Sequence, residues 1–186
     1  MDENFWKDAY KDSWAKASDK ENWVKSSIEK AASIPVEIVG LGAGSTDYIS
    51  GSAASNDKEK GGADLYLPSL DIYVEVTGPN IKVSESDTLW VRPDKIASAL
   101  RKIEEGIGMM HLVVHMAELR PNGQKLARVI FIEKRIKDAI ADGTIELINP
   151  KIRGNVEQYY AIPANYVLVR PYENFLQFLR NASRPL

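Results

Sequence analysis

The chain has 186 residues, 44% of them hydrophobic and 27% charged, which is ordinary for a soluble globular protein and sufficient for one domain. The absence of cysteine excludes disulfide bonds, thiolate metal sites and a cysteine nucleophile. The net charge of -2 gives no overall attraction to nucleic acid, although residues 1–91 carry 9 Lys+Arg against 16 Asp+Glu and residues 92–186 carry 15 against 10.

The N-terminal region is predicted to be helical. Residues with large apolar side chains recur there at helical spacing: Trp6, Tyr10, Trp14, Val24 and Ile28. The sequence SDKE, residues 18–21, fits a capping box, in which Ser18 and Glu21 satisfy backbone donors at a helix start. We therefore predict one helix to about residue 17, a second over residues 19–33, and a short strand in VEIVGL.

The central region is predicted to contain a long loop followed by a β-hairpin. Residues 42–62 are rich in Gly, Ser and Asn and have no apolar period, which indicates a loop of a length that is usually functional or disordered. The runs ADLYL, residues 63–67, and IYVEVT, residues 72–77, then predict a hairpin around a four-residue turn that begins with Pro and ends with Asp. Residues 80–91 are expected to be irregular.

The remaining elements alternate between helix and strand. We predict a helix over residues 92–106, a buried strand over 109–117, a helix over 123–141, strands over 144–148 and 165–171, and a helix over 172–181. This order predicts a single α/β domain over residues 1–186, with a mixed central sheet. It would comprise N-terminal helices (1–33), a core that carries the motifs (34–118) and C-terminal helices and strands (119–186).

Two acids in the hairpin are the main functional signal. Side chains alternate faces along a strand, and pairing Leu67 with Ile72 matches the apolar faces of the two runs. The same register puts Asp64 opposite Glu75, where like charges repel unless one carboxyl is protonated or a cation lies between them. Mg²⁺ would suit such a pair. The alternative is that both acids face solvent without a role, and a one-residue slip would separate them.

The motifs GGAD and VEVT, with Asp64 and Glu75, resemble the core of the PD-(D/E)xK nuclease superfamily. The sequence GAGS before them resembles the Ser-Gly loop of archaeal Holliday-junction resolvases, and the order helix, three strands, helix, strand matches over residues 19–117. The resemblance implies a restriction-endonuclease-like α/β/α sandwich and a Mg²⁺- or Mn²⁺-dependent DNA endonuclease, with branched DNA as one candidate substrate. A restriction-type or repair role is equally open.

The resemblance also implies a role for each matched position. Asp64, Glu75 and the Val76 carbonyl would bind the metal, and Ser45 would lie near the scissile phosphate. Glu21 would be the helix acid that ligates the metal directly or through water, unless its role is the capping box. Glu29 is a weaker rival for that position.

The chain departs from the family at Thr77, where a lysine usually orients the attacking water. Lys95 is the first candidate to replace that lysine and Lys82 the second, although an ordinary surface lysine is the alternative for Lys95. If neither reaches the site, the protein would be a slow nuclease or an inactive relative that binds DNA or serves an assembly. A hydrolase of a small phosphate ester is a third possibility. His111 and His115 are interpreted as core or edge histidines.

Location and partners are inferred from the same features. No apolar run could span a membrane, and the first fourteen residues are acidic and amphipathic rather than signal-like, so we expect a cytoplasmic, intracellular protein without a membrane partner. The acidic first half and basic second half fit a cation site that faces a phosphate-binding surface, or a merely uneven scatter of charge. DNA is the expected partner, and a homodimer is expected because cutting both strands favours two sites.

Overall fold

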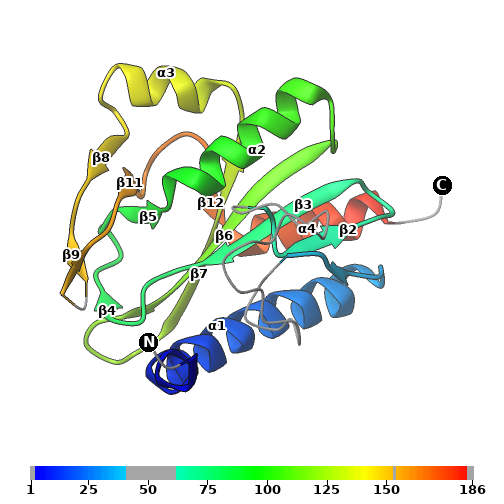
Figure 1. The fold of residues 1–186 in the computed structure, drawn as a ribbon. Coiled ribbons are helices and arrows are strands. Elements are labelled where there is room, and N and C mark those ends of the chain that lie inside the picture. Colours follow the sequence, from blue (N-terminus) through cyan, green and yellow to red (C-terminus); the bar gives the residue numbers. More distant parts are fainter. Residues whose placement is uncertain (1–2, 41–61, 153, 184–186) are drawn as a thin grey trace.

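The computed structural model describes residues 3–40, 62–152 and 154–183, with side chains from residue 16 onward. This part of the chain has a mixed α/β fold in which helices cover both faces of a central sheet (Figure 1). Four helices are described: α1 (Glu3–Ala32), α2 (Pro93–Glu105), α3 (Arg135–Ala141) and α4 (Tyr172–Ala182).

The central sheet is mixed. Its main path follows the order β1 (Glu37–Ile38), β2 (Leu65–Leu67), β3 (Ile72–Thr77), β6 (Met110–Leu119), β7 (Lys125–Ile132) and β12 (Val169–Pro171), and β4 (Lys82–Val83) also pairs with β6. Strands β3 and β6 are parallel, which requires a crossover connection, and this connection contains α2. The predicted order of helix, three strands, helix and strand is therefore present in α1, β1, β2, β3, α2 and β6, with β4 and β5 inserted before α2.

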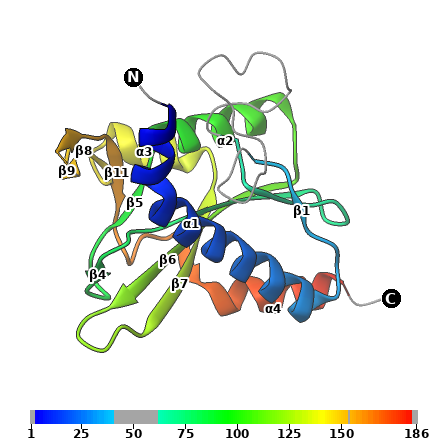
Figure 2. The same ribbon diagram turned by 60° about the horizontal axis from the view of Figure 1, so that its bottom comes forward.

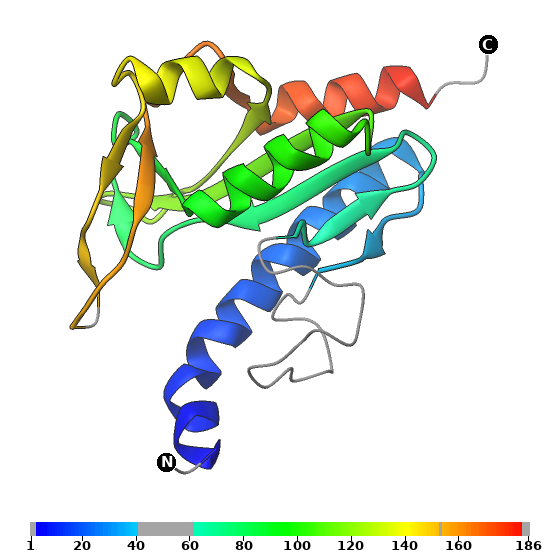
Figure 3. The ribbon, with the colours of Figure 1, turned by 45° about the horizontal axis from the view of Figure 1, so that its top comes forward.

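Two smaller sheets extend the structure beside the central one. Strands β5 (Leu89–Val91), β11 (Tyr159–Ile162) and β8 (Glu146–Ile148) form an antiparallel sheet, and β9 (Lys151–Ile152) pairs with β10 (Asn155–Val156). Figure 3 shows these strands at one end of the molecule, next to α3. Residues 80–91, expected to be irregular, thus contain the short strands β4 and β5.

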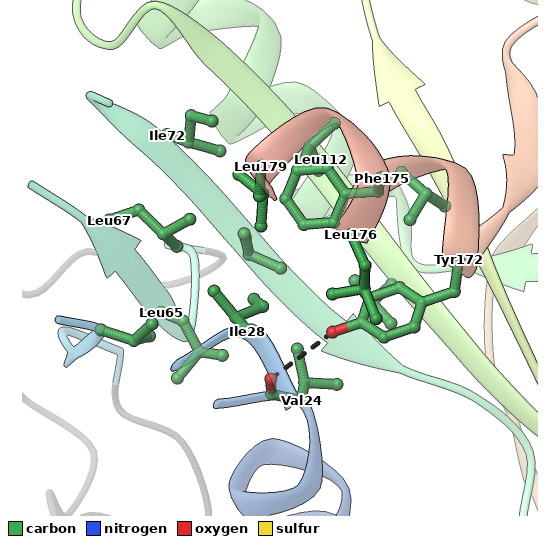
Figure 4. Packing of buried hydrophobic residues seen from close by; sticks show 14 of the residues in the cluster. Val24, Ile28, Leu65, Leu67, Ile72, Leu112, Tyr172, Phe175, Leu176 and Leu179 are labelled. Atoms are coloured by element: carbon green, nitrogen blue, oxygen red, sulfur yellow. Dashed lines mark hydrogen bonds between the residues drawn. The ribbon is translucent and has the colours of Figure 1, made fainter. Parts of the chain in front are cut away.

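Each face of the central sheet has its own apolar core. Helices α1 and α4 cover one face, as Figure 2 shows, and α2 and α3 cover the other. The first core includes Val24 and Ile28 of α1 and Phe175 of α4 (Figure 4). Tyr172 of α4 links the two helices, because its hydroxyl lies 2.7 Å from the Ser27 hydroxyl. Strand β6 is buried on both faces, which explains its almost unbroken apolar sequence.

The prediction of two N-terminal helices is wrong. Helix α1 is continuous from Glu3 to Ala32, and the proposed capping residue Ser18 accepts a hydrogen bond from the Asn22 side chain within the helix at 3.3 Å. No Gly or Pro interrupts the segment, so nothing in the backbone requires a stop at this point. Glu21 therefore has no capping role, and its side chain is buried.

The prediction of a helix over residues 123–141 is wrong in its first half. Residues 125–132 form β7, and only α3 is helical. The run of Val129, Ile130, Phe131 and Ile132 has strong β propensity, and β7 fills the position between β6 and β12 with both neighbours antiparallel. The late strand expected over residues 165–171 is reduced to β12. None of the described helices is long and apolar enough to cross a membrane.

Candidate functional site

The hairpin register predicted from the sequence is confirmed. Leu67 pairs with Ile72, Tyr66 with Tyr73 and Leu65 with Val74. Asp64 lies just before β2, outside the ladder, and its carboxyl is close enough to that of Glu75 for each to act on the other. The Tyr66 and Tyr73 rings lie with centroids 4.5 Å apart on the same face as the acids. Both carboxyl side chains are buried: the residues are 5% and 8% exposed. The two acids therefore do not face solvent.

Asp64 is fixed through its backbone and its side chain. Its N–H donates to the Val74 carbonyl at 3.1 Å, and its carbonyl accepts from the N–H groups of Val39 and Gly40 at 2.9 and 3.2 Å. Its carboxylate Oδ2 accepts a hydrogen bond from the Val76 N–H at 2.8 Å. Gly40 packs so closely on Asp64 that a Cβ there would lie 2.8 Å from the Asp64 Cα. The Asp64 backbone is thus held by the residues that follow β1, and its carboxylate is oriented by β3.

Lys95 reaches the acid pair from the first turn of α2. Its Nζ donates to Oε2 of Glu75 at 2.8 Å and to the Gly62 carbonyl at 3.1 Å. The two side chains are 19% and 10% exposed, so the ion pair is largely removed from water. Pro93 occupies the first position of α2, where its fixed φ favours a helix start, and so sets where Lys95 projects. The surface-lysine alternative for Lys95 does not hold.

Burial dominates the electrostatics of the three groups. Burial raises the pKa of Asp64, against the opposing effects of the Lys95 charge and the Val76 N–H. Burial and the negative charge of Asp64 raise the pKa of Glu75 well above its ordinary value. Burial by itself lowers the pKa of Lys95, but the two carboxylates outweigh it and raise the pKa overall. All three groups therefore hold their protons more tightly than the same groups do in water.

Glu21 lies on the row of α1 that faces the sheet. It precedes Val24 by three residues and Ile28 by seven, and both of these are fully buried in the core under β3. Its neighbour Lys20 donates to the carbonyls of Gly78 and Pro79 at 2.8 and 3.2 Å, which places this turn of α1 at the C-terminal end of β3. Glu21 is therefore near the end of the strand that carries Glu75, on the opposite face.

The other predicted site residues are not brought to the acid pair. Glu29 accepts a hydrogen bond from Lys25 at 2.5 Å, four residues earlier in the same helix. Lys82 is exposed and donates to the Pro121 carbonyl at 3.5 Å. It pairs with Glu118, five residues further along β6 than the partner of Glu75, a separation of about 16 Å. Ser45 lies outside the described residues.

The donor set at the acid pair is compatible with a small divalent cation. Mg²⁺ binds oxygen ligands and commonly uses one or two carboxylates together with water and a substrate phosphate. Asp64 and Glu75 supply two carboxylates, and the Val76 carbonyl is a third oxygen on the same strand. A cavity of about 20 Å³ beside Glu75 and Lys95 has room for one water. Within the described ranges, no three His, Asp or Glu side chains are grouped so as to hold a metal, so Glu21 does not complete such a set.

Thr77, at the position where the motif usually has a lysine, lies next to a histidine and an arginine on the neighbouring strands. It pairs with His115 of β6, and His115 pairs with Arg128 of β7, so the three lie side by side across the sheet. The sequence indicates a core or edge histidine at His115, and the predicted helix over residues 123–141 places Arg128 outside the sheet. The alternation of the strands could have placed His115 on the face of Glu75.

No protein-family model, curated protein or solved structure matches the chain. The chemistry of the site therefore follows from its own geometry: two buried carboxyls, a charged lysine and a polar row on the same face of the sheet.

Proposed function

We propose that the protein is a metal-dependent DNA endonuclease of the PD-(D/E)xK type, with Mg²⁺ or Mn²⁺ as its cofactor. One observation carries the proposal: the buried carboxyls of Asp64 and Glu75, which act on each other, are met by Lys95 from a separate element. Two acids and a lysine at one point are the groups that this kind of nuclease requires. A hairpin selected for stability alone would not bury like charges opposite each other.

The acid pair would hold the metal, with the Val76 carbonyl as a further oxygen. A bound metal would lower the pKa of a coordinated water and stabilise negative charge on the phosphate. Metal binding is also expected to lower the pKa of Glu75, because a cation stabilises the ionised carboxylates that burial disfavours. The hydrogen bond from the Val76 N–H keeps the Asp64 carboxylate oriented through this change.

Lys95 would act as a fixed cation. The two carboxylates raise its pKa, so it stays charged at neutral pH and cannot serve as a base. Its role would be to orient the attacking water and to offset charge on the phosphate. The water oxygen would form a bond to phosphorus as it loses a proton to solvent, the bond from phosphorus to the leaving oxygen would break, and that oxygen would take a proton from solvent.

The arrangement of elements supports the same proposal at the level of the fold. The hairpin with the acids lies between α1 and α2, and its second strand is parallel to β6 across the α2 crossover. We infer a restriction-endonuclease-like fold from this order. Duplex and branched DNA are both candidate substrates, and a homodimer would bring two sites to the two strands.

A second candidate function is a nuclease-like module that binds without cutting. The ion pair between Lys95 and Glu75 favours it, because this contact stabilises the site without a metal and Thr77 supplies no further cation. In that case Lys95 would serve folding, and metal would have no effect on the protein. The two functions therefore differ in their response to Mn²⁺.

The direct test is cleavage of labelled single-stranded, duplex and four-way-junction DNA with Mn²⁺, using wild type, Glu75→Gln and the control Glu173→Gln. Glu173 is an exposed glutamate of α4 on the other side of the sheet. We expect wild type and Glu173→Gln to cut at least one substrate and Glu75→Gln to cut none. Absence of cutting by folded wild type on all three substrates would favour the binding module.

A further inference from the structure

A row of three side chains crosses the central sheet beside the acid pair. Thr77 of β3, His115 of β6 and Arg128 of β7 are mutual neighbours in the strand register. Glu75 pairs with Val113, which packs in the core under α2, so residues two positions further along each strand lie on the same face. The Thr77–His115–Arg128 row therefore lies about 7 Å from the acid pair on the same side of the sheet.

His115 is buried without a full set of hydrogen bonds. The residue is 6% exposed, and its Nε2 has no hydrogen-bond partner among the described residues. Burial and the positive charges of Lys20 and Arg128 lower the pKa of His115 to about 3. The imidazole is thus uncharged at neutral pH. Buried polar atoms normally have partners, so an unpaired one on this face is a candidate ligand contact.

Arg128 is only partly satisfied by the protein. A guanidinium has five N–H donors, and the contact to the Glu85 carbonyl at 2.7 Å is the one hydrogen bond that the Arg128 guanidinium makes within the described residues. Its nearest carboxylate is that of Glu85, whose Oε1 lies 3.8 Å from Nη2 while its side chain is 74% exposed. The Arg128 side chain itself is 15% exposed. Arg128 therefore has donors left for a partner that approaches from solvent.

The charges around the row select an anion rather than a second metal ion. Arg128 comes from β7, and Lys20 comes from α1, where it is anchored on the carbonyls of Gly78 and Pro79. Both cations act on His115, and both would repel a metal ion. Guanidinium groups bind phosphate with two parallel hydrogen bonds, and a hydroxyl and an imidazole can complete such a site.

We propose that Arg128, Thr77 and His115 bind a backbone phosphate of the DNA strand, next to the phosphate that lies at Asp64 and Glu75. This inference rests on the proposed nuclease function and adds a substrate contact to it. Glu85 stands beside Arg128 in the absence of DNA, so its carboxylate would compete with the phosphate. Loss of Arg128 and loss of the Glu85 charge must then have opposite effects on DNA binding.

The test is the affinity of a fluorescein-labelled oligonucleotide in EDTA, where no cleavage occurs, measured by anisotropy over a range of salt concentrations. We expect Arg128→Gln to weaken binding several-fold and to reduce the slope of log K against log salt by about 0.9 for duplex DNA or 0.7 for a single strand. Glu85→Gln should tighten binding. Arg180→Gln, which removes an arginine of α4 paired with Glu173, should change neither. Equal effects of Arg128→Gln and Arg180→Gln would overturn the proposal.

A second readout does not depend on the folding of an arginine variant. The chain has two histidines, so NMR can follow both imidazoles in wild type during titration with inorganic phosphate. We expect the His115 resonances to move and those of His111, whose Nε2 contacts the Ile107 carbonyl at 2.7 Å, to stay. Two results together would contradict the site. They are His115 resonances of wild type that do not move with phosphate, and a DNA affinity that is unchanged in Glu85→Gln.

The two proposals fail in different ways. Cleavage of the same oligonucleotide by wild type with Mn²⁺ tests the nuclease, and the salt slopes in EDTA test the phosphate site. A protein that never cuts but loses salt slope in Arg128→Gln would keep the phosphate site and lose the nuclease. If wild type cuts DNA but the salt slope is unchanged in Arg128→Gln, the nuclease proposal would stand and the phosphate site would be rejected.

Discussion

The Nζ of Lys95 lies 2.8 Å from Oε2 of Glu75, although the two residues belong to different elements. In the motif that VEVT resembles, the cation follows the glutamate by two positions on the same strand, where this chain has Thr77. Here the cation comes instead from the first turn of α2, which packs over β6 and β7. The charge is therefore supplied at the carboxylate without a lysine at the motif position.

This relationship predicts the effect of moving the lysine. We expect Lys95→Gln to lower the rate of DNA cleavage roughly 100-fold or more, the usual result of removing one group that stabilises developing charge. The double variant Lys95→Gln with Thr77→Lys should recover part of the rate, since it returns a cation to the motif position. Lys102→Gln is the control, because Lys102 lies over the Tyr73 ring at 4.9 Å and not on Glu75. Undiminished cleavage by Lys95→Gln would show that another cation serves the site.

The raised pKa of Glu75 predicts that Glu75→Gln gains stability while it loses activity. A buried acid whose pKa is raised on folding binds its proton more tightly in the folded state, so the free energy of unfolding falls as pH rises from about 4.3 towards the raised pKa. In EDTA, Glu75→Gln should therefore become more stable than wild type as pH rises, by at most about 1.4 kcal/mol per pH unit.

Thermal unfolding of both proteins across this pH range checks the prediction. Mg²⁺ or Mn²⁺ should raise the Tm of wild type and leave that of Glu75→Gln unchanged, because ligands stabilise only the state that binds them. A Glu75→Gln protein that is less stable than wild type at every pH would mean that the ion pair with Lys95 outweighs the burial of charge.

The acid pair was predictable because it depends on a local rule. Alternation and matched apolar faces fix the register of a hairpin, and the observed pairs Leu67–Ile72 and Leu65–Val74 follow that rule. The lysine was only one of two candidates, because which lysine reaches Glu75 depends on how α2 crosses the sheet. The crossing angle of α2 over the sheet cannot be derived from the spacing of residues in the sequence.

The two wrong predictions have separate causes. The sequence predicts a helix over residues 123–141, but residues 125–132 form β7, which is held in place by β6 and β12, and β12 is distant in sequence. The capping-box pattern is a local signal only: α1 continues through it, and no Gly or Pro breaks the helix there. The sequence did not indicate Arg128 as a site residue, because the predicted helix over residues 123–141 removed it from the sheet.

The close approach of Gly40 to Asp64 predicts that a methyl group there would damage the site. A Cβ at Gly40 would lie 2.8 Å from the Ala63 carbonyl oxygen and 3.1 Å from Oδ1 of Asp64. We expect Gly40→Ala to cost about 1–3 kcal/mol of stability, as overpacking usually does, and to reduce cleavage by displacing the carboxylate. Gly143→Ala is the matched control: that glycine has φ +81° with open space around its Cβ position, so its loss should reduce stability and spare activity. Equal cleavage by the two variants would show that Asp64 tolerates the displacement.

The lowered pKa of His115 predicts a loss of stability in acid. The folded protein keeps this imidazole neutral down to about pH 3, whereas the unfolded chain protonates it below about pH 6.5. The unfolded state therefore binds more protons in this window, and the free energy of unfolding falls as pH decreases, by at most about 1.4 kcal/mol per pH unit. His115→Gln should flatten the dependence measured by urea unfolding between pH 6.5 and 4. His111→Gln should flatten it less, because the hydrogen bond to the Ile107 carbonyl opposes the effect of burial on the pKa of His111. An unchanged pH profile in His115→Gln would contradict the prediction. It would mean that folding does not lower the pKa of His115.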